Sequence, residues 1–535
     1  MKHSMLCGLI AASVFALAAC SDDDNNSDDG SDGSQSTLTI EQTGRYQVEP
    51  FAFDEGAAEI VAYDASLQRL FVVNANANTV DVLDIADPSN LHRLGSIDAT
   101  TEGASANSVA VHEGTVAVAI EAEDAQAPGK VVFYSGSGLE KLGEATVGAL
   151  PDMVTFTPNG ERVLVANEGE PNDDYDNDPQ GSISVVDLSA GFNVPTVTTL
   201  DFTAFNAQAD ALRDAGVRIF GPGATPAQDF EPEYIAVSAD GSRAYISLQE
   251  NNAIAVADLD ALEITAVLPL GYKDHSVAGQ GIDPSNADGL DVRPVPVLGM
   301  YQPDTIAAFE RDGVTYLLTA NEGDARDYDG FSEEVDVADV TLDTDAFPNA
   351  ADLQTEGQLG DLKITSTLGD SDGDDAYEAL YAFGARSFSI RRAQDAALVY
   401  DSGDDFERIT GEIYGEDFNN DNTENDGDSR SDNKGPEPEA IAYGEVDGRA
   451  FAFIGLERMG GFFVYEIDDV SAPRYVAYIN NRDLDADPQA GRAGDLGPES
   501  IVFIAAADSP LAGVPLLVVG NEISGSTTVY RLGME

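Results

Sequence analysis

The stretch PDMVTFTPNGERVLVANEG, residues 151–169, decides the fold. It reads as an acidic residue, an apolar strand, a turn at Asn159-Gly160, a second apolar strand and a polar group that contains Glu168. An Asn-Gly turn between two β-branched segments is typical of a β-hairpin. The same pattern makes seven copies in all, the other six at residues 59–76, 107–123, 232–251, 303–323, 438–458 and 498–522.

The hairpins belong to larger repeated units, because a further strand follows several of them, beginning near Ser182, Ala253 and Gly461. Three or four strands per unit fit the blade of a β-propeller. We therefore predict an all-β fold, a seven-bladed β-propeller of the YVTN or WD40 type, over residues 38–535. Residues 38–48 are predicted to add a strand to the C-terminal blade.

The copies are unevenly spaced, with intervals of 48, 45, 81, 71, 135 and 60 residues between their first positions. The short intervals match bare blades. The longer ones predict acidic loop insertions, and such loops commonly carry function.

The N-terminus resembles an export signal. A charged start is followed by an apolar run that ends at Ala19, too short to span a bilayer. The sequence Leu17-Ala18-Ala19-Cys20 resembles the bacterial lipobox, so residues 1–19 are predicted to be a lipoprotein signal peptide and Cys20 the lipidated first residue of the mature chain. In the alternative, Cys20 is an ordinary residue of a signal cleaved elsewhere. Residues 21–37 have no core-forming pattern and predict a disordered acidic tether, which gives domains at 1–19, 20–37 and 38–535.

Charge and cysteine content limit which partners the protein can bind and which chemistry it can perform. The formal net charge of -70 makes nucleic acid an improbable partner and requires screening by salt or bound cations. The second cysteine, Cys7, lies in the signal, so the mature chain has no disulfide and no cysteine nucleophile. Resemblance to lipoproteins with Ser21 after the cysteine favours the outer membrane or cell surface, with the periplasmic side as the alternative.

Acidic residues recur at matching positions of the repeats. Superposed blades would bring the first acids together at one mouth of a central channel: Asp152, Glu233, Asp304, Glu439 and Glu499. A second set follows 16 to 23 residues later: Glu168, Glu250, Glu322, Glu457 and Glu522. Crowded carboxylates bind protons more tightly or recruit a hard cation, and calcium is the predicted ion. Alternatively, these acids bond turn amides or loop arginines.

A second candidate calcium site lies in an insertion. The loop GDSDGDDAYE, residues 369–378, alternates acids at Asp370, Asp372 and Asp374, as calcium loops do. A solvated loop of an acidic protein is the alternative.

Nucleophilic catalysis has little support, because the mature chain has only His92, His112 and His275, none near an obvious serine or aspartate motif. Hydrolysis would require cation-activated water. Candidates for steering an anion are Arg326, Arg386, Lys434 and Arg458, unless they pair with neighbouring acids.

Several stretches together resemble the choice-of-anchor I family of extracellular proteins: 166–175, 318–331, 380–390, 400–410, 430–441, 453–467 and 494–504. The resemblance covers almost the whole mature sequence. It implies surface attachment by one of several anchors. Some relatives are described as atypical alkaline phosphatases and others as mesenchyme-specific cell-surface glycoproteins, and no catalytic residue carries over to this chain.

The resulting hypothesis is a lipid-anchored, calcium-binding propeller, an extracytoplasmic binding or scaffold module. It would be held at the membrane by its lipid and would present its loops to an anionic ligand or surface polymer. The alternative is a calcium-dependent, alkaline-phosphatase-like phosphomonoesterase, a metal-dependent phosphoric ester hydrolase. The sequence leaves open whether the protein is an enzyme.

Overall fold

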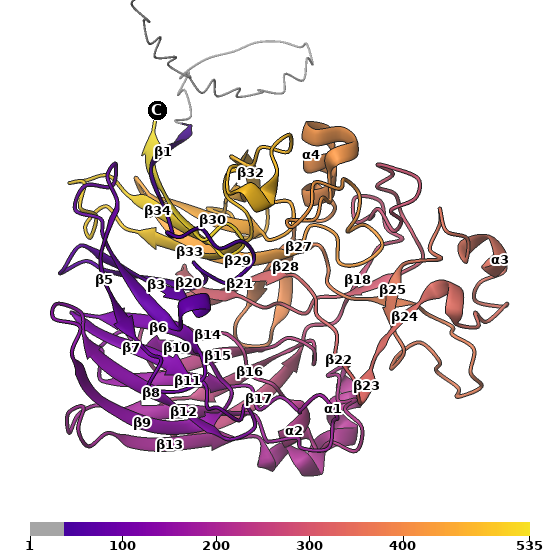
Figure 1. Ribbon diagram of the computed structural model, residues 1–535. Helices are drawn as coiled ribbons and strands as arrows, with labels where there is room; N and C mark the ends of the chain where they lie inside the picture. Colours follow the sequence, from indigo (N-terminus) through magenta and orange to yellow (C-terminus); the bar gives the residue numbers. More distant parts are fainter. Residues whose placement is uncertain (1–36) are drawn as a thin grey trace, which may run out of the picture. The chain divides into compact units, whose positions relative to one another are not determined.

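A computed structural model describes residues 37–535, of which Leu38–Glu535 form one compact unit. The predicted signal peptide, Cys20 and nearly all of the predicted tether lie outside the described residues. Figure 1 shows the unit as a set of sheets with loops and short helices beside them.

Seven four-stranded antiparallel sheets make up most of the described chain, so the predicted all-β fold is confirmed. In chain order the first three are β2 (Val61–Asp64), β3 (Arg69–Asn74), β4 (Thr79–Asp84) and β5 (His92–Asp98); β6 (Ala106–His112), β7 (Thr115–Ile120), β8 (Pro128–Ser135) and β9 (Lys141–Ala149); β10 (Pro151–Phe156), β11 (Arg162–Asn167), β12 (Ser182–Asp187) and β13 (Thr196–Asp201).

The next three sheets are β14 (Ile235–Val237), β15 (Arg243–Leu248), β16 (Ala253–Asp258) and β17 (Glu263–Pro269); β20 (Ile306–Arg311), β21 (Val314–Asn321), β27 (Ser387–Arg392) and β28 (Ala397–Asp401); β29 (Pro438–Val446), β30 (Arg449–Leu456), β31 (Phe462–Glu466) and β32 (Arg474–Ile479). The seventh combines β33 (Pro498–Ile504), β34 (Leu516–Asn521) and β35 (Ser526–Met534) with β1 (Leu38–Gln47). Each predicted hairpin supplies the first two strands of one sheet.

The first strand of the chain pairs with the last. β1 runs antiparallel to β35, with Leu38 opposite Met534 and Gln47 opposite Ser526. The predicted strand at residues 38–48 and its pairing with the C-terminal blade are therefore confirmed.

Neighbouring sheets are held together by shared apolar cores. Consecutive sheets share one hydrophobic cluster each, as where Phe71 of β3 packs in the same cluster as Val118 of β7. The last sheet shares a cluster with the first, in which Leu516 of β34 joins Leu70 of β3. Second and third strands are therefore apolar on both faces, and β16, AIAVAD, has five buried residues in a row.

Long insertions leave the sheets at one end. The turns from first to second strand are short, whereas the connections from second to third strand and from one sheet to the next can be long. In an antiparallel sheet these two kinds of connection start at the same end of the strands. They hold η1 (Ala75–Ala77), η2 (Thr203–Gln208), α1 (Ala209–Ala215), α2 (Pro226–Asp229), β22 (Asp327–Tyr328), β23 (Phe331–Ser332), α4 (Asp405–Tyr414), η4 (Gly415–Asp417) and η5 (Pro488–Ala490).

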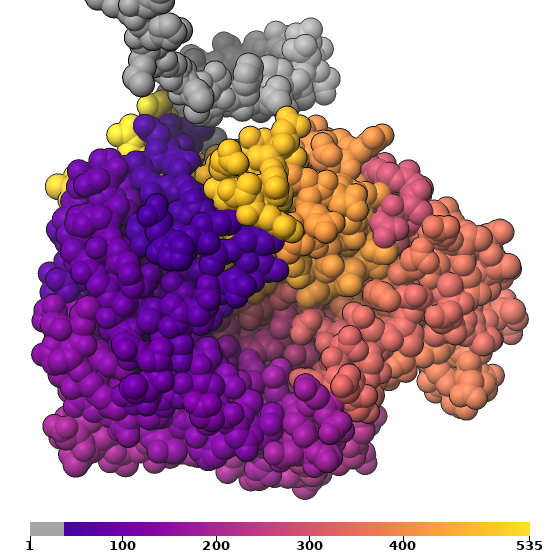
Figure 2. Space-filling model, in the orientation of Figure 1, coloured from indigo at the N-terminus to yellow at the C-terminus, as the bar shows by residue number. Residues whose placement is uncertain are grey.

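Two insertions build a further sheet. Its five strands follow the order β18 (Tyr272–Asp274), β19 (Leu298–Met300), β26 (Tyr381–Ala382), β25 (Lys363–Thr365) and β24 (Glu334–Asp336), and η3 (Val337–Asp339) and α3 (Ala350–Leu353) lie in the same insertion as β24. Ile282, Leu359 and Ile364 belong to its own buried core. Figure 2 shows residues near 340–370 as a lobe that projects from the side of the sheets.

No helix in residues 37–535 is long and apolar enough to cross a membrane.

Candidate metal centre

Acidic residues flank the inner hairpins of five sheets. One lies at or just before the start of the first strand, as Asp152 does in β10, and the other follows the second strand, as Glu168 follows β11. Because the two strands are antiparallel neighbours, both acids lie at the same end of the sheet. This is the end from which the insertions leave.

Irregular pairing accompanies several of these acids. The register between first and second strand shifts between Pro151 and Val154, between Pro438 and Ile441, and between Pro498 and Ser500. A shift of this kind turns side chains away from the regular alternation of a strand. Asp152, Glu439 and Glu499 each lie inside such a shift.

The flanking acids meet around one cavity. It has a volume of about 340 Å³ and is lined by twelve residues, eleven with carboxylates and one amide: Asp152, Glu168, Glu170, Glu233, Gln249, Glu250, Asp304, Glu322, Asp324, Glu439, Glu457 and Glu499. No lining residue is basic. The cavity therefore favours cations.

Nine of the ten predicted ring acids line this cavity, and Glu522 does not. Glu522 lies close to Glu59, the acid that opens the first hairpin copy. Its charge adds to the burial that raises the pKa of Glu59. Burial raises the pKa of Glu522 itself to about 7. The repeat thus predicted which acids come together, but it did not predict that Glu522 lies outside the cavity lining.

Two lining acids, Glu170 and Asp324, are absent from the ten predicted positions. Both have the same signal, an acid two residues after the one that ends the second strand, in Glu168-Gly169-Glu170 and Glu322-Gly323-Asp324. The glycine between them has positive φ in each copy, +70° and +96°, so the chain turns back and presents both carboxylates to the cavity.

Burial and mutual repulsion make the cavity acids weak acids. Burial raises the pKa of Asp152 to about 7, and the carboxylates of Asp304 and Glu170 add to the shift. Burial likewise raises the pKa of Glu250 to about 8, although Arg326 opposes it. The pKa is also raised, by burial first and neighbouring carboxylates second, for Glu168, Glu233, Glu439 and Glu499.

Three of the lining acids are close enough to share one ion. Carboxylate oxygens of Glu322, Glu439 and Glu457 all lie within 4.8 Å of one another, and all three residues are buried. Glu322 accepts hydrogen bonds from Gln249 Nε2 at 2.9 Å and Lys434 Nζ at 2.8 Å. Glu439 shares a hydrogen bond with Asp304, which raises the pKa of Glu439 further.

Lys434 and Arg458 lie beside the cavity but are already paired. Both contact Glu437, Lys434 Nζ at 3.3 Å and Arg458 Nε at 3.1 Å. Burial would raise the pKa of Glu437, but Lys434, Arg458 and Arg430 together lower it to about 2. Glu437 is therefore a carboxylate that holds two of the predicted anion-steering residues.

Arg326 and Arg386 are buried in ion pairs of their own. Arg326 is 2% exposed and contacts Asp229 Oδ1 at 2.7 Å and Glu231 Oε2 at 2.9 Å. Arg386 is 3% exposed and contacts Glu407 Oε1 at 2.6 Å. The alternative interpretation, in which the four basic residues pair with acids, describes their contacts.

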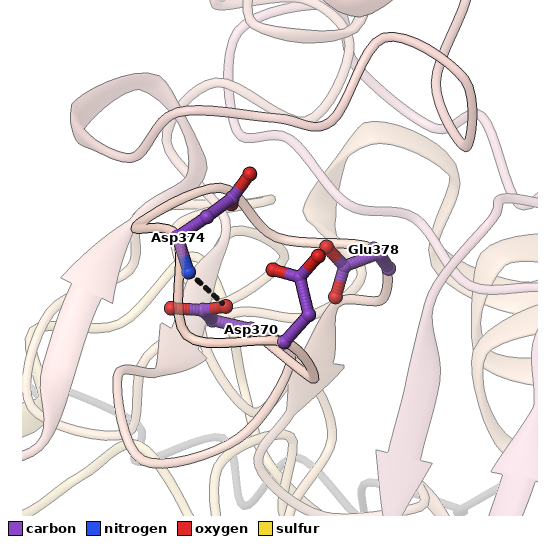
Figure 3. A group of neighbouring side chains, drawn as sticks. Asp370, Asp374 and Glu378 are labelled. Carbon is purple, nitrogen blue, oxygen red and sulfur yellow. Dashed lines mark hydrogen bonds between the residues drawn. The ribbon is translucent and has the colours of Figure 1, made fainter.

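The exposed loop of residues 369–378 also gathers its acids. Oxygens of Asp370, Asp372, Asp374 and Glu378 lie within 4.8 Å of one another. Asp370 accepts hydrogen bonds from the amides of Gly373 and Asp374, the latter drawn in Figure 3. Glu378 accepts two from Ser371. These bonds hold the loop together, as the solvated-loop alternative expects, and the carboxylates converge as a calcium loop would require.

The cavity has oxygen ligands and no side-chain nucleophile other than its carboxylates. No serine, threonine or histidine lines it. His275 is buried and bonds the carbonyl of Gln280 through Nδ1 at 2.7 Å. Binding of a hard cation is thus the chemistry for which the arrangement is suited.

Comparison with known proteins relates most of the chain to one domain family and parts of it to two curated proteins. The family model of the choice-of-anchor I domain matches residues 59–470. Gigasin-3a of Magallana gigas is 29% identical over 191 residues, which span 34% of this chain and 66% of that protein. The mesenchyme-specific cell surface glycoprotein of Strongylocentrotus purpuratus is 27% identical over 340 residues, 55% of this chain and 43% of its own length. The match thus spans less than two thirds of either relative.

The solved structures that resemble this chain have lower sequence identity to it than the two curated proteins. Hydrazine synthase of Kuenenia stuttgartiensis has a TM-score of 0.46 at 13% identity and covers 91% of this chain and 99% of its own. The Cps50 (Swd1) β-propeller domain of Myceliophteria thermophila has a TM-score of 0.45 at 10% identity, with 92% and 99% covered.

Proposed function

Because the chain belongs to the choice-of-anchor I family, we propose that it is a cell-surface β-propeller whose central cavity binds calcium. The single observation that carries the proposal is the cavity of about 340 Å³ with eleven carboxylates and no basic residue in its lining. The name of the sea-urchin relative, a cell surface glycoprotein, supports the location. Lipid attachment at Cys20, at the outer membrane or cell surface, belongs to the same proposal.

The seven four-stranded sheets are the seven blades. Support comes from their packing, since each sheet shares a hydrophobic cluster with the next, and the last with the first. The pairing of β1 with β35 adds to this, because joining the two chain ends in one sheet is how propellers close without exposed edges. The acidic cavity is then the mouth of the central channel.

Calcium suits the cavity better than other common ions. Its lining offers carboxylate and amide oxygens without sulfur or imidazole, a set that hard cations prefer. Calcium takes six to eight oxygen ligands in flexible geometry, whereas magnesium requires a near-ideal octahedron and keeps its water. The bound ion would compensate carboxylates that otherwise repel one another, and it would offer an anionic ligand or surface polymer a positive contact in a negatively charged protein. In this role the protein is a binding or scaffold module.

Calcium should stabilise the metal-stripped protein against heat. Binding to the folded state alone adds about 2.7 kcal/mol at a free calcium concentration one hundred times the Kd. The joint substitution Glu322→Gln and Glu439→Gln should remove most of this calcium-dependent rise in Tm, measured by differential scanning calorimetry.

A matched control variant removes the same number of negative charges from exposed residues. Glu123→Gln with Asp124→Asn alters two exposed acids and should leave the calcium response unchanged. A Tm that does not respond to calcium in the unsubstituted protein would contradict the proposal.

The alternative function is a calcium-dependent phosphomonoesterase, in which the bound ion would activate water and polarise a phosphate. It has less support, because Arg326, Arg386, Lys434 and Arg458 are engaged with carboxylates. We expect no release of phosphate from simple monoesters with calcium present. Turnover that stops with chelator, and that Glu439→Gln abolishes without loss of the fold, would favour the enzyme instead.

A further inference from the structure

The acidic cavity has two parts that differ in their counter-charges. In the part of the chain that the structure describes, the basic residues that form ion pairs with lining carboxylates are Lys434, with Glu322 and Asp324, and Arg458, with Glu457. Both basic residues pair with acids in the part of the cavity formed by the sheets of β20–β21 and β29–β30. The trio Glu322, Glu439 and Glu457 lies in this part.

The other part, formed by the sheets of β10–β11 and β14–β15, has acids without such partners. The charges that most shift the pKa of Glu168 and Glu233 all belong to other carboxylates. Arg326 is the basic residue that acts on Glu250, but its guanidinium is committed to Asp229 and Glu231. A single divalent ion at the trio Glu322, Glu439 and Glu457 would leave this part without a counter-charge of its own.

Carboxylate oxygens without hydrogen-bond donors lie in the same part of the cavity. Glu233 Oε2 and Glu250 Oε2 are buried and accept no hydrogen bond from the described residues, and the two side chains are 7% and 6% exposed. Both residues line the cavity, and Glu168, Glu233 and Glu250 are near enough to repel one another. A buried carboxylate oxygen without a donor is costly unless water or a cation meets it. By contrast, both oxygens of Glu322 have donors.

We propose that the cavity binds two cations, one at Glu322, Glu439 and Glu457 and a second between Glu168, Glu233 and Glu250. This inference rests on the proposed calcium binding and adds a second subsite to it. Space allows both, because about 340 Å³ corresponds to roughly eleven waters at ~30 Å³ each. The second trio does not reach the 4.8 Å spacing of the first, so the ion there keeps bound water or draws the side chains inward.

Counting bound calcium tests the second subsite. The full protein is stripped of metal with a chelator and dialysed against radioactive calcium at pH 8, where protons compete least. The joint substitution Glu233→Gln and Glu250→Gln should lower the calcium bound at saturation by one ion per chain, and Glu439→Gln with Glu457→Gln should lower it by one different ion. Combining all four should remove both, whereas Glu123→Gln with Asp124→Asn should remove neither.

The outcomes separate the two proposals. If the Glu233 and Glu250 variant keeps the full number of ions while the Glu439 and Glu457 variant loses one, the second subsite is wrong and calcium binding stands. If neither variant loses an ion, calcium does not bind in the cavity and the proposed function fails as well.

Folding of the variants is checked without metal. Glutamine resembles the protonated form that burial favours at these positions, so each variant should melt in chelator at or above the temperature of the unsubstituted protein. If a variant melts at a lower temperature, its calcium count is not used, and the single substitution Glu233→Gln is measured in its place. This substitution should lower the affinity for the second ion at least tenfold. An unchanged affinity in that single variant also overturns the second subsite.

Discussion

Replacing Arg326 with methionine should lower the free energy of unfolding by about 3–5 kcal/mol, the range seen when one partner of a buried ion pair is removed. The guanidinium is 2% exposed and donates to Asp229 Oδ1, to the Asp229 carbonyl and to Glu231. Without it, two buried carboxylates face each other with no counter-charge. Urea unfolding, followed by tyrosine fluorescence, measures the change.

An exposed ion pair provides the control. Arg392 pairs with Asp395 at 2.6 Å, and both side chains are 47% exposed, so Arg392→Met should cost less than about 1 kcal/mol. Adding Glu231→Gln to Arg326→Met should restore part of the loss, because it removes one of the stranded charges. Equal effects of the two arginine substitutions would contradict the structural role of Arg326.

In the presence of chelator, Tm should fall as the pH rises from about 5 to 8. The folded protein holds protons on Asp152 and Glu522 up to a pKa of about 7, and on Glu250 and Glu59 up to about 8, whereas the unfolded chain releases them near 4. In this window the folded state binds more protons than the unfolded state, so stability is lost with rising pH, by about 1.4 kcal/mol per pH unit for each such group.

Saturating calcium should reverse this trend. The ion replaces the protons as counter-charge, so the difference in Tm between calcium and chelator should grow from pH 5 to 8. Calorimetry across this range at constant ionic strength measures both curves. A Tm in chelator that rises with pH would refute the assignment of protons to the cavity.

A surface acid with a lowered pKa does not contribute to this pH dependence. Asp240, for example, accepts hydrogen bonds from Ser242 and Ser238 that lower its pKa to about 2, so it is ionised throughout the window. The slope therefore reports the buried carboxylates together with buried His275, whose pKa burial lowers and which acts in the opposite direction.

The hairpins could be predicted from sequence because each is local. Residues 151–169 hold both strands and their turn, and the apolar alternation needs no distant partner to be recognised. Nine of the eleven acids that line the cavity were predicted for the same reason, since repeats that superpose place equivalent residues together.

Contacts between distant segments could not be predicted. Arg326 meets Asp229 across 97 residues, and nothing in the sequence near either residue indicates the other. The five-stranded sheet has strands of two or three residues, too short for a periodic pattern, and one parallel pair, β19 with β26, joins segments about eighty residues apart. Sequence analysis therefore left open whether Arg326 and Arg386 steer an anion or pair with acids, and it could not name Asp229, Glu231 and Glu407 as their partners.

The pairing of β1 with β35 has a consequence for the order of events as the protein is made. Five of the seven four-stranded sheets consist of strands that are consecutive in the chain, so each can assemble once its own segment has left the ribosome. Leu38 at the start of β1 must wait for Met534, 496 residues later, and a partner that distant makes the step slow. A chain that stops short of β35 loses its first strand as well as its last, so a late truncation leaves a nearly full-length product with two unpaired strand edges and a tendency to aggregate.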